Sequence, residues 1–192
     1  ANTIATGSIL FVIIKAFSKI SGAHFNPAVS LVLFFLKKTN QTEMLFYILF
    51  QIFGGLLGVF MTHYIFNLEI IQVSSNARGE ERMLVSEIIA TFGLVLTILF
   101  VNDNHPEDLA FAVALFISAG YWFTSSTAFA NPAVTLARAF TDTFTGIHPN
   151  STFYFICGQG IGSILAFIFY KKTRMPSEGM ISVRLELTTL GL

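Results

Sequence analysis

Two copies of the tripeptide Asn-Pro-Ala carry the chemistry that stands out most in this chain. Their members are Asn26, Pro27, Ala28, Asn131, Pro132 and Ala133. Asn is favoured as a helix N-cap, its amide both donates and accepts hydrogen bonds, and Pro is favoured at the first helical position. Each motif therefore predicts a helix start that carries about half a positive charge. Two such ends that meet would repel cations, while Asn26 and Asn131 offer donors to a passing oxygen.

The other reactive side chains form no arrangement that is typical of an enzyme. The four His residues have no metal-ligand spacing, and the single cysteine, Cys157, has no partner for an internal disulfide. There is no nucleophile–base pair, phosphate-binding loop or carboxylate pair. We therefore predict no enzymatic activity, no cofactor and no metal site.

Composition predicts that these motifs lie in a membrane. The chain is 54% hydrophobic and 11% charged, whereas soluble domains have roughly a quarter charged residues. Three stretches without Asp, Glu, Lys or Arg are 44–68, 109–137 and 143–170. Each exceeds the roughly 20 apolar residues that span a bilayer. A net charge of zero argues against a nucleic-acid partner.

The hydrophobic pattern predicts an all-α membrane protein. Five spanning helices are expected at about 3–20, 43–66, 83–101, 108–127 and 151–171. Two half-helices begin at the motifs, at about 27–36 and 132–142, and each would reach roughly half-way through a bilayer. Such segments occur at membrane depth where protein or a water-filled cavity satisfies their backbone ends.

The two halves of the chain form a repeat that extends beyond the motifs, because Gln51-x-x-Gly54 matches Gln159-x-x-Gly162. We expect one channel domain, 1–171, followed by a cytoplasmic tail, 172–192. Its second repeat, 83–171, reads helix, helix, half-helix, helix. The first repeat, 1–66, lacks the opening helix, so the fold is expected to be an inverted repeat without its first transmembrane helix.

Basic residues predict the orientation. The larger group is Lys15, Lys19, Lys37, Lys38, Lys171, Lys172, Arg174 and Arg184, and the smaller group is Arg78, Arg82 and Arg138. The positive-inside rule puts the larger group in the cytoplasm, with the C-terminus. We expect a multi-pass protein of the cell (inner) membrane, whose two motifs enter the lipid bilayer from opposite faces.

Several phrases together resemble the aquaporin, or major intrinsic protein, family. They are His24-Phe25-Asn26-Pro27-Ala28-Val29, Asn131-Pro132-Ala133-Val134, Ser21-Gly22-Ala23 and Glu87-x-x-x-Thr91-Phe92. The resemblance implies a homotetramer with one pore per subunit and six spanning helices, whereas five are expected here. It also implies that Glu87 supports the loop of the second motif through backbone N–H groups.

The resemblance also implies a selectivity filter at four positions, which spacing from the motifs carries over to Thr6, Ala119, Ala128 and Val134. Family members commonly have an aromatic, a His and an Arg among them, and Val134 stands in the Arg position. We therefore expect a wide, mostly apolar constriction with Thr6 as its only side-chain hydroxyl. Such a filter suits neutral solutes larger than water.

The residues from Val134 to Thr143 indicate a particular subgroup of this family. Val134-x-x-x-Arg138 and Thr141-Asp142-Thr143 resemble the aquaglyceroporins associated with bacterial arsenic resistance. That likeness implies undissociated arsenite or antimonite as solutes, along with glycerol and water.

Two side chains near the motifs have alternative roles. Arg138 either guards the outer vestibule in place of the missing filter Arg or forms an exposed pair with Asp142, and we favour the pair. His24 either lines the cytoplasmic vestibule or packs in a hydrogen-bonded site. The small-residue pairs expected to allow close helix packing are Gly54 with Gly58 and Gly158 with Gly162.

A passive channel for small uncharged solutes is the leading prediction. The first alternative is an orthodox water channel, which would normally have the narrow aromatic and Arg filter. The second is a non-conducting, truncated remnant or a structural membrane protein, which the absent opening helix suggests.

Overall fold

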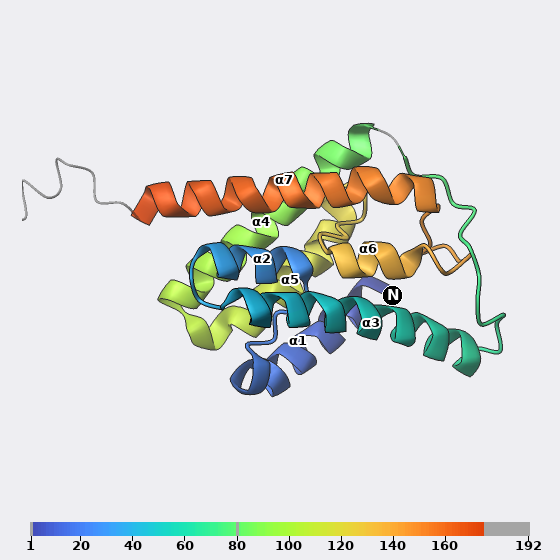
Figure 1. Ribbon diagram of the computed structural model, residues 1–192, viewed down its shortest axis with the longest axis horizontal. Helices are drawn as coiled ribbons and strands as arrows, with labels where there is room; N and C mark the ends of the chain where they lie inside the picture. Colours follow the sequence, from blue (N-terminus) through green and yellow to red (C-terminus); the bar gives the residue numbers. More distant parts are fainter. Residues whose placement is uncertain (1, 80, 175–192) are drawn as a thin grey trace, which may run out of the picture.

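The computed structural model describes residues 2–79 and 81–174, and all regular structure in these residues is helical. The elements are α1 (Asn2–Ser21), α2 (Pro27–Phe35), α3 (Gln41–Ile65), α4 (Glu81–Asn104), η1 (Pro106–Asp108), α5 (Leu109–Phe123), α6 (Pro132–Arg138) and α7 (Pro149–Arg174). Figure 1 shows one bundle in which the short α2 and α6 lie among the longer helices. The predicted all-α membrane fold with two half-helices is confirmed. The predicted tail, 172–192, falls outside the described residues after Arg174.

The half-helices start where the motifs predict. Asn26 and Asn131 are N-caps in extended conformation, and Pro occupies the first helical position of both α2 and α6. The Oδ1 atom of Asn26 accepts the Ala28 N–H at 2.9 Å. The Oδ1 atom of Asn131 accepts the N–H groups of Ala133 and Val134 at 3.0 and 3.3 Å. These bonds satisfy backbone donors that a helix start leaves free.

The second half-helix is shorter than predicted. It was expected to reach 142, but it ends at Arg138 after seven residues, or about 10 Å. The carbonyl oxygen of Arg138 accepts the Ile147 N–H at 3.1 Å, and that of Ala139 accepts the Ser74 N–H at 3.0 Å. Distant loop segments therefore bind the carbonyl groups at this helix end, which local sequence patterns cannot reveal.

Within the described part of the chain, four helices, α1, α3, α4 and α7, are long and apolar enough to cross a membrane. The fifth predicted span, 108–127, is present as α5 but has 15 residues and ends at Phe123. Both the N–H and the hydroxyl of Thr124 bind the Gly120 carbonyl oxygen, at 3.2 and 2.7 Å. The Ser126 N–H donates to Ser86 of α4 at 3.0 Å. These bonds turn the chain toward α4 and end the helix.

Apolar side chains face outward and polar side chains lie inside, as contact with lipid requires. On α3, large apolar side chains such as Phe50, Phe53 and Leu57 are exposed. In contrast, Glu87 and Gln159 are completely buried. Apolar groups outside and paired polar groups inside are the arrangement expected of a protein whose solvent is a bilayer.

One of the two predicted glycine pairs packs helices closely. A Cβ at Gly158 or Gly162 of α7 would lie 2.6 Å from a carbonyl oxygen of α4, so α4 and α7 are in contact at these points. Gly54 and Gly58 of α3 instead face open space within 4 Å. The packing role is therefore confirmed for α7, and no described residue packs against the α3 pair.

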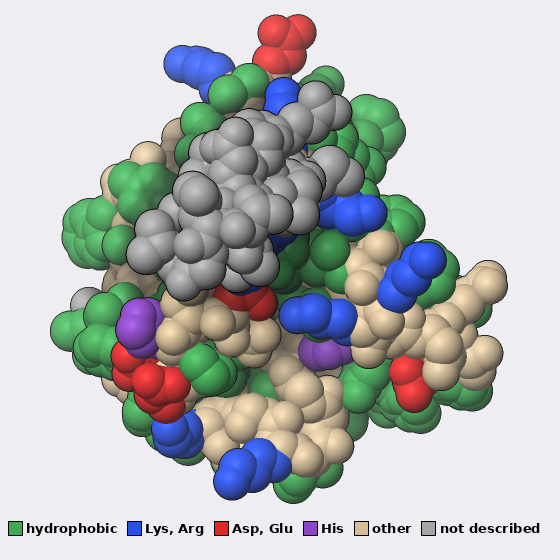
Figure 2. Space-filling model, turned by 90° about the vertical axis from the view of Figure 1, so that its left-hand side faces the viewer, with side chains coloured by type: hydrophobic (Ala, Val, Ile, Leu, Met, Phe, Trp, Pro, Cys, Tyr) green, Lys and Arg blue, Asp and Glu red, His purple; other side chains and the backbone are tan. Residues whose placement is uncertain are grey.

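The members of the larger basic group that the structure describes, from Lys15 to Arg174, gather at one end of the bundle. Figure 1 shows the C-terminal ends of α1, α4 and α7 and the start of α3 at this end. Figure 2 views the same end, with Lys and Arg side chains spread over it. The smaller group lies on the loop before α4, in the first turn of α4 and at the end of α6, toward the opposite end of the bundle.

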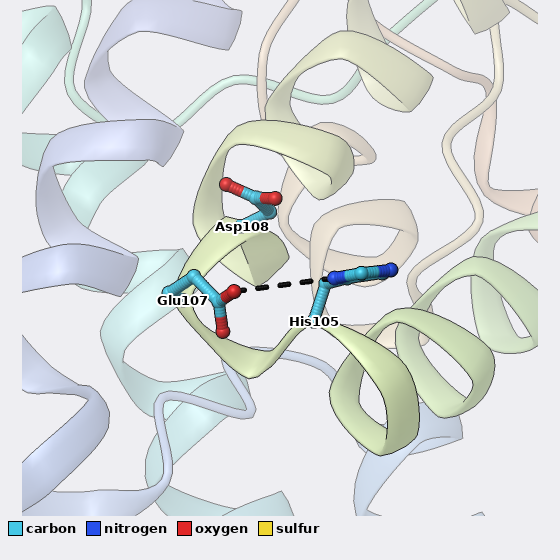
Figure 3. A group of neighbouring side chains, drawn as sticks. All are labelled: His105, Glu107 and Asp108. Carbon is cyan, nitrogen blue, oxygen red and sulfur yellow. Dashed lines mark ion pairs between the residues drawn. The ribbon is translucent and has the colours of Figure 1, made fainter.

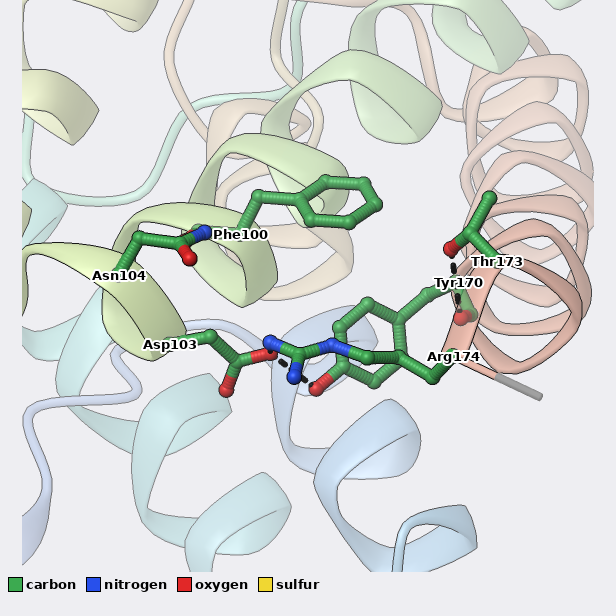
Figure 4. A network of polar contacts seen from close by, with 6 residues as sticks. All are labelled: Phe100, Asp103, Asn104, Tyr170, Thr173 and Arg174. Carbon is green, nitrogen blue, oxygen red and sulfur yellow. Dashed lines mark hydrogen bonds and ion pairs between the residues drawn. The ribbon is translucent and has the colours of Figure 1, made fainter. Parts of the chain in front are cut away.

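A polar network joins the C-terminal ends of α4 and α7 (Figure 4). Asp103 of α4 accepts hydrogen bonds from the Tyr170 hydroxyl and from the Arg174 guanidinium. The guanidinium also lies 5.6 Å from the centre of the Tyr170 ring. The network joins two spanning helices whose middle sections meet at the glycines of α7.

Candidate functional site

The two motifs are hydrogen-bonded to each other at the centre of the molecule. The Asn26 Nδ2 atom donates to the Ala130 carbonyl oxygen at 2.7 Å, and Asn131 Nδ2 donates to the Phe25 carbonyl oxygen at 2.8 Å. Each amide thus uses its oxygen to cap its own helix and one N–H to hold the other repeat. The second N–H of each amide remains as a donor.

The loops before the motifs share an unusual backbone conformation. Phe25 and Ala130 have φ of 46° and 45°, and Ala23 and Ala128 have φ of 49° and 47°. The members of each pair are 105 positions apart, as the motifs are. Residues other than Gly seldom adopt positive φ, and such strain concentrates at functional sites. The repeat therefore extends to the backbone geometry of the two loops.

Glu87 holds the second loop in this conformation. Its carboxylate oxygens accept the N–H groups of Phe129 and Ala130 at 3.0 and 2.7 Å. Gln159 Nε2 donates to the same carboxylate at 2.6 Å and to Thr135 Oγ1 at 2.8 Å. This geometry fits the supporting role that the resemblance implies.

The first loop has only part of this network. Ser30 Oγ receives Gln51 Nε2 at 3.0 Å and lies 3.1 Å from His24 Nδ1. Ser30 and Gln51 thus match Thr135 and Gln159 of the second repeat. Among the described residues no carboxylate completes the set, and the buried Oε1 atom of Gln51 has no hydrogen-bond partner.

His24 combines the two roles that the sequence left open. Besides its contact with Ser30, its ring lies 4.6 Å from the Tyr47 ring, and the side chain also lines the central cavity. The pKa of His24, in the loop between α1 and α2, is lowered by burial. The neutral imidazole is therefore favoured on this part of the cavity wall.

A cavity of about 420 Å³ passes both motifs. Its lining runs from Lys38 and Asn102, near the basic end, to Tyr121 and Arg138 at the other end. The residues between them that matter here are Thr6, Asn26, Val29, Leu33, Val113, Ile117, Ala128, Asn131 and Val134. Most of the wall is apolar, and among the described residues its charged side chains are Lys38 and Arg138. The described lining residues include no carboxylate.

The structure brings together three of the four predicted filter positions. Thr6, Ala128 and Val134 line the cavity, whereas Ala119 lies on the exposed face of α5 and is absent from the lining. Tyr121, which the sequence reasoning missed, lines the cavity instead. Ala119 was chosen by counting residues back from the second motif, and this count contains no information on how the loop between α5 and α6 turns. The four-residue spacing of Val113, Ile117 and Tyr121 would have indicated this helix face.

Arg138 does not form the expected pair with Asp142. The Asp142 carboxylate accepts the N–H and the hydroxyl of Ser75 at 2.8 and 2.9 Å, while the Arg138 guanidinium lies 4.4 Å from the centre of the Phe129 ring. The expected pair required one continuous helix through residues 138 and 142. Because α6 ends at Arg138, Asp142 does not lie one turn further along the same helix face. Arg138 therefore belongs to the cavity wall.

Arg78 is a second basic residue beside this wall, and no sequence motif predicted a role for it there. Its guanidinium donates to the Ser126 carbonyl oxygen at 3.0 Å and lies 5.3 Å from the Phe129 ring centre. The pKa of Arg78 is lowered by burial and then by the nearby charge of Arg138. Phe129 thus lies between two guanidinium groups near the end of the cavity.

One group of side chains has ligand atoms close enough to hold a metal ion. His105, Glu107 and Asp108 bring these atoms within 4.8 Å of one another. Figure 3 shows His105 and Glu107 facing each other around η1, with 4.0 Å between Nδ1 and Oε1. All three residues are exposed and lie outside the cavity. Such a surface cluster does not bear on the site at the motifs.

Comparison with known proteins gives consistent results. The family profile described as "Major intrinsic protein" matches residues 1–109. The chain is 41% identical to "Aquaglyceroporin AqpS" of Rhizobium meliloti (strain 1021) over 181 residues, which are 94% of this chain and 78% of that protein. It is 27% identical to "Aquaporin-4" of Homo sapiens, covering 88% of this chain and 55% of that one. It is also 27% identical to "Aquaporin-2" of Rattus norvegicus, with 95% and 70% covered.

Proposed function

The chain belongs to the major intrinsic protein family, and we propose that it is a passive channel for small uncharged solutes. The preferred solutes are glycerol and the hydroxides of trivalent arsenic and antimony, and water passes as well. The observation that carries the proposal is the cavity that runs past Asn26 and Asn131, where two half-helix starts meet. Helix N-terminal dipoles and free amide donors favour a solute oxygen at that point.

Electrostatics supports the exclusion of cations. Both half-helices direct their positive ends toward the middle of the cavity, and Lys38 and Arg138 lie toward its two ends. A cation would lose part of its hydration without meeting a carboxylate in the described lining. A neutral solute avoids most of that cost.

The small filter residues support solutes larger than water. Ala128 and Val134 are short and apolar, and Thr6 adds one hydroxyl to the wall. The relative named an aquaglyceroporin supports glycerol. Arsenite and antimonite rest on the likeness of the Val134-to-Thr143 segment to arsenic-resistance channels. Arg138 then acts as the guard at the outer end, in place of an Arg at position 134.

The proposed assembly follows the family. We place the basic end of the bundle and the C-terminus in the cytoplasm, because Lys and Arg concentrate at that end. We also propose a homotetramer in the cell membrane, with one cavity per subunit.

Solute uptake by proteoliposomes tests the proposed function. Liposomes that contain the complete protein should take up glycerol and arsenite faster than empty liposomes of the same lipid. Equal rates would refute the channel proposal and favour a non-conducting protein. Water flux measured by stopped flow should not greatly exceed solute flux. A large excess of water flux would favour the orthodox water channel.

A further inference from the structure

Tyr121 lies on the cavity-facing side of α5. Val113, Ile117 and Tyr121 recur every four residues and all line the cavity. The adjacent Trp122 is 82% exposed and points away from it. One face of the helix thus lines the cavity, and a larger aromatic side chain lies next to it on the exposed face.

Gly120 allows this face to approach the second motif. A Cβ at Gly120 would lie 2.6 Å from the Ala128 Cβ atom, which is closer than real Cβ contacts come. The missing side chain lets α5 pack directly against the loop that carries Ala128. Tyr121 is the next residue along the helix, so it lies near Ala128, one of the predicted filter positions.

The hydroxyl of Tyr121 has a defined orientation. It donates to Thr6 Oγ1 at 3.3 Å, and the Thr6 hydroxyl donates to the Asn2 carbonyl oxygen at 3.0 Å. Both hydroxyl protons are therefore used within the protein. The remaining lone pairs on the two oxygens can only accept hydrogen bonds from a solute.

We propose that Tyr121 is a specificity-determining residue of the channel mouth. Together with Thr6 it forms an edge of hydrogen-bond acceptors, and its ring sets the width beside the short side chains of Ala128 and Val134. This edge selects compact solutes that carry several O–H donors, such as glycerol and metalloid hydroxides. The inference rests on the proposed channel function and identifies the side chain that tunes it.

Two substitutions of Tyr121 separate its hydroxyl from its ring. Tyr121→Phe removes one acceptor and should lower glycerol flux about fivefold, since one hydrogen bond contributes about 1 kcal/mol. Tyr121→Ala should widen the mouth and raise the ratio of xylitol flux to glycerol flux. Trp122→Phe and Trp122→Ala are matched controls, because they change an adjacent aromatic residue outside the cavity.

Thiol labelling tests directly whether the side chain at position 121 faces the cavity. In a Cys157→Ser background, Tyr121→Cys should bind a methanethiosulfonate reagent and lose glycerol flux. Ala119→Cys should keep its flux under the same treatment. If flux in the Tyr121 variants matches the controls while the Ala119 variant is blocked, the inference is wrong. If the unmodified protein conducts no solute, the proposed function fails first and the inference fails with it.

Discussion

Val134 lines the cavity at the position where the family resemblance places the filter Arg. It lines the wall one helical turn before Arg138 on the same face of α6. In the proposed channel, a short apolar side chain here would leave the passage open to solutes larger than water. The nearest positive charge lies further out, above the Phe129 ring. The proposed channel would therefore select by size and by charge at different points along the cavity.

Placing an arginine at this position should restore a narrow filter. Val134→Arg is expected to lower glycerol and arsenite flux by at least about tenfold, because it adds bulk and a second charge beside Arg138. Water flux should fall much less. Val134→Thr, which keeps nearly the same volume, should leave the glycerol flux close to that of the unmodified protein. Proteoliposome uptake measures both variants, and undiminished glycerol flux in Val134→Arg would contradict this account of the filter.

Glu87 is the single residue on which the second loop depends most. Glu87→Gln replaces one acceptor oxygen with an NH2 group that faces donors from Phe129, Ala130 and Gln159. The mismatch in a fully buried site should destabilise the protein by about 1–3 kcal/mol. Thermal unfolding in detergent should show a lower midpoint than for Glu43→Gln, which alters an exposed capping box on α3. Equal midpoints would show that Glu87 is not the support of this loop.

The sequence alone was enough to predict the positions of residues whose role follows from a motif or from polarity. Asn26 and Asn131 occupy their expected N-cap positions, and Glu87 makes the expected backbone contacts. Tyr121 and Arg78 escaped prediction because their roles depend on how a loop turns and on which ring lies nearby. The Arg138–Asp142 pair was wrong for a related reason, since it assumed a helix that in fact ends at Arg138.

At the scale of elements, the two halves of the bundle differ in how completely their helices are covered. On α7, Gly162 allows contact with α4, whereas its repeat counterpart on α3, Gly54, has nothing within 4 Å. Element starts were predicted well because N-caps are local signals. The ends of α5 and α6 were not predicted well, because the hydrogen bonds at these ends come from α4 and from the 74–76 loop.

The two glycines predict unequal effects of the same substitution. Gly162→Val would force a side chain against the Ile88 carbonyl oxygen and should destabilise the chain by about 1–3 kcal/mol. Gly54→Val should change the stability of residues 1–192 far less, because its Cβ would enter open space. Thermal midpoints in the same detergent compare the two variants directly. An equal loss for both would mean that α3 is covered in the assembled protein.

At the scale of the whole molecule, the inverted repeat gives the cavity two unlike ends. The basic end contains Lys38, and the opposite end contains Arg138 together with Tyr121 and Thr6. Val29 and Val134 are equivalent in the repeat and both line the wall, but Leu33 stands where the second half has Arg138. A molecule built from two related repeats therefore has a cavity whose two ends differ in chemistry.

The orientation proposed for the bundle can be tested by labelling from each side. In a Cys157→Ser background, Lys19→Cys should react only with reagent on the cytoplasmic side of the membrane. Asn150→Cys, at the opposite end of the bundle, should react only from outside. A membrane-impermeant maleimide on intact cells and on inverted vesicles distinguishes the two. Reversed labelling would overturn the charge-based orientation while leaving the fold unaffected.

The paired bonds between Asn26 and Ala130 and between Asn131 and Phe25 have a consequence for biosynthesis. Each loop obtains a partner for its amide from the other repeat, which is made about a hundred residues earlier or later. The first loop therefore cannot complete its hydrogen bonds while the ribosome is still translating the intervening helices. The centre of the protein takes its final shape only after the second loop enters the membrane, so it is a late step in folding.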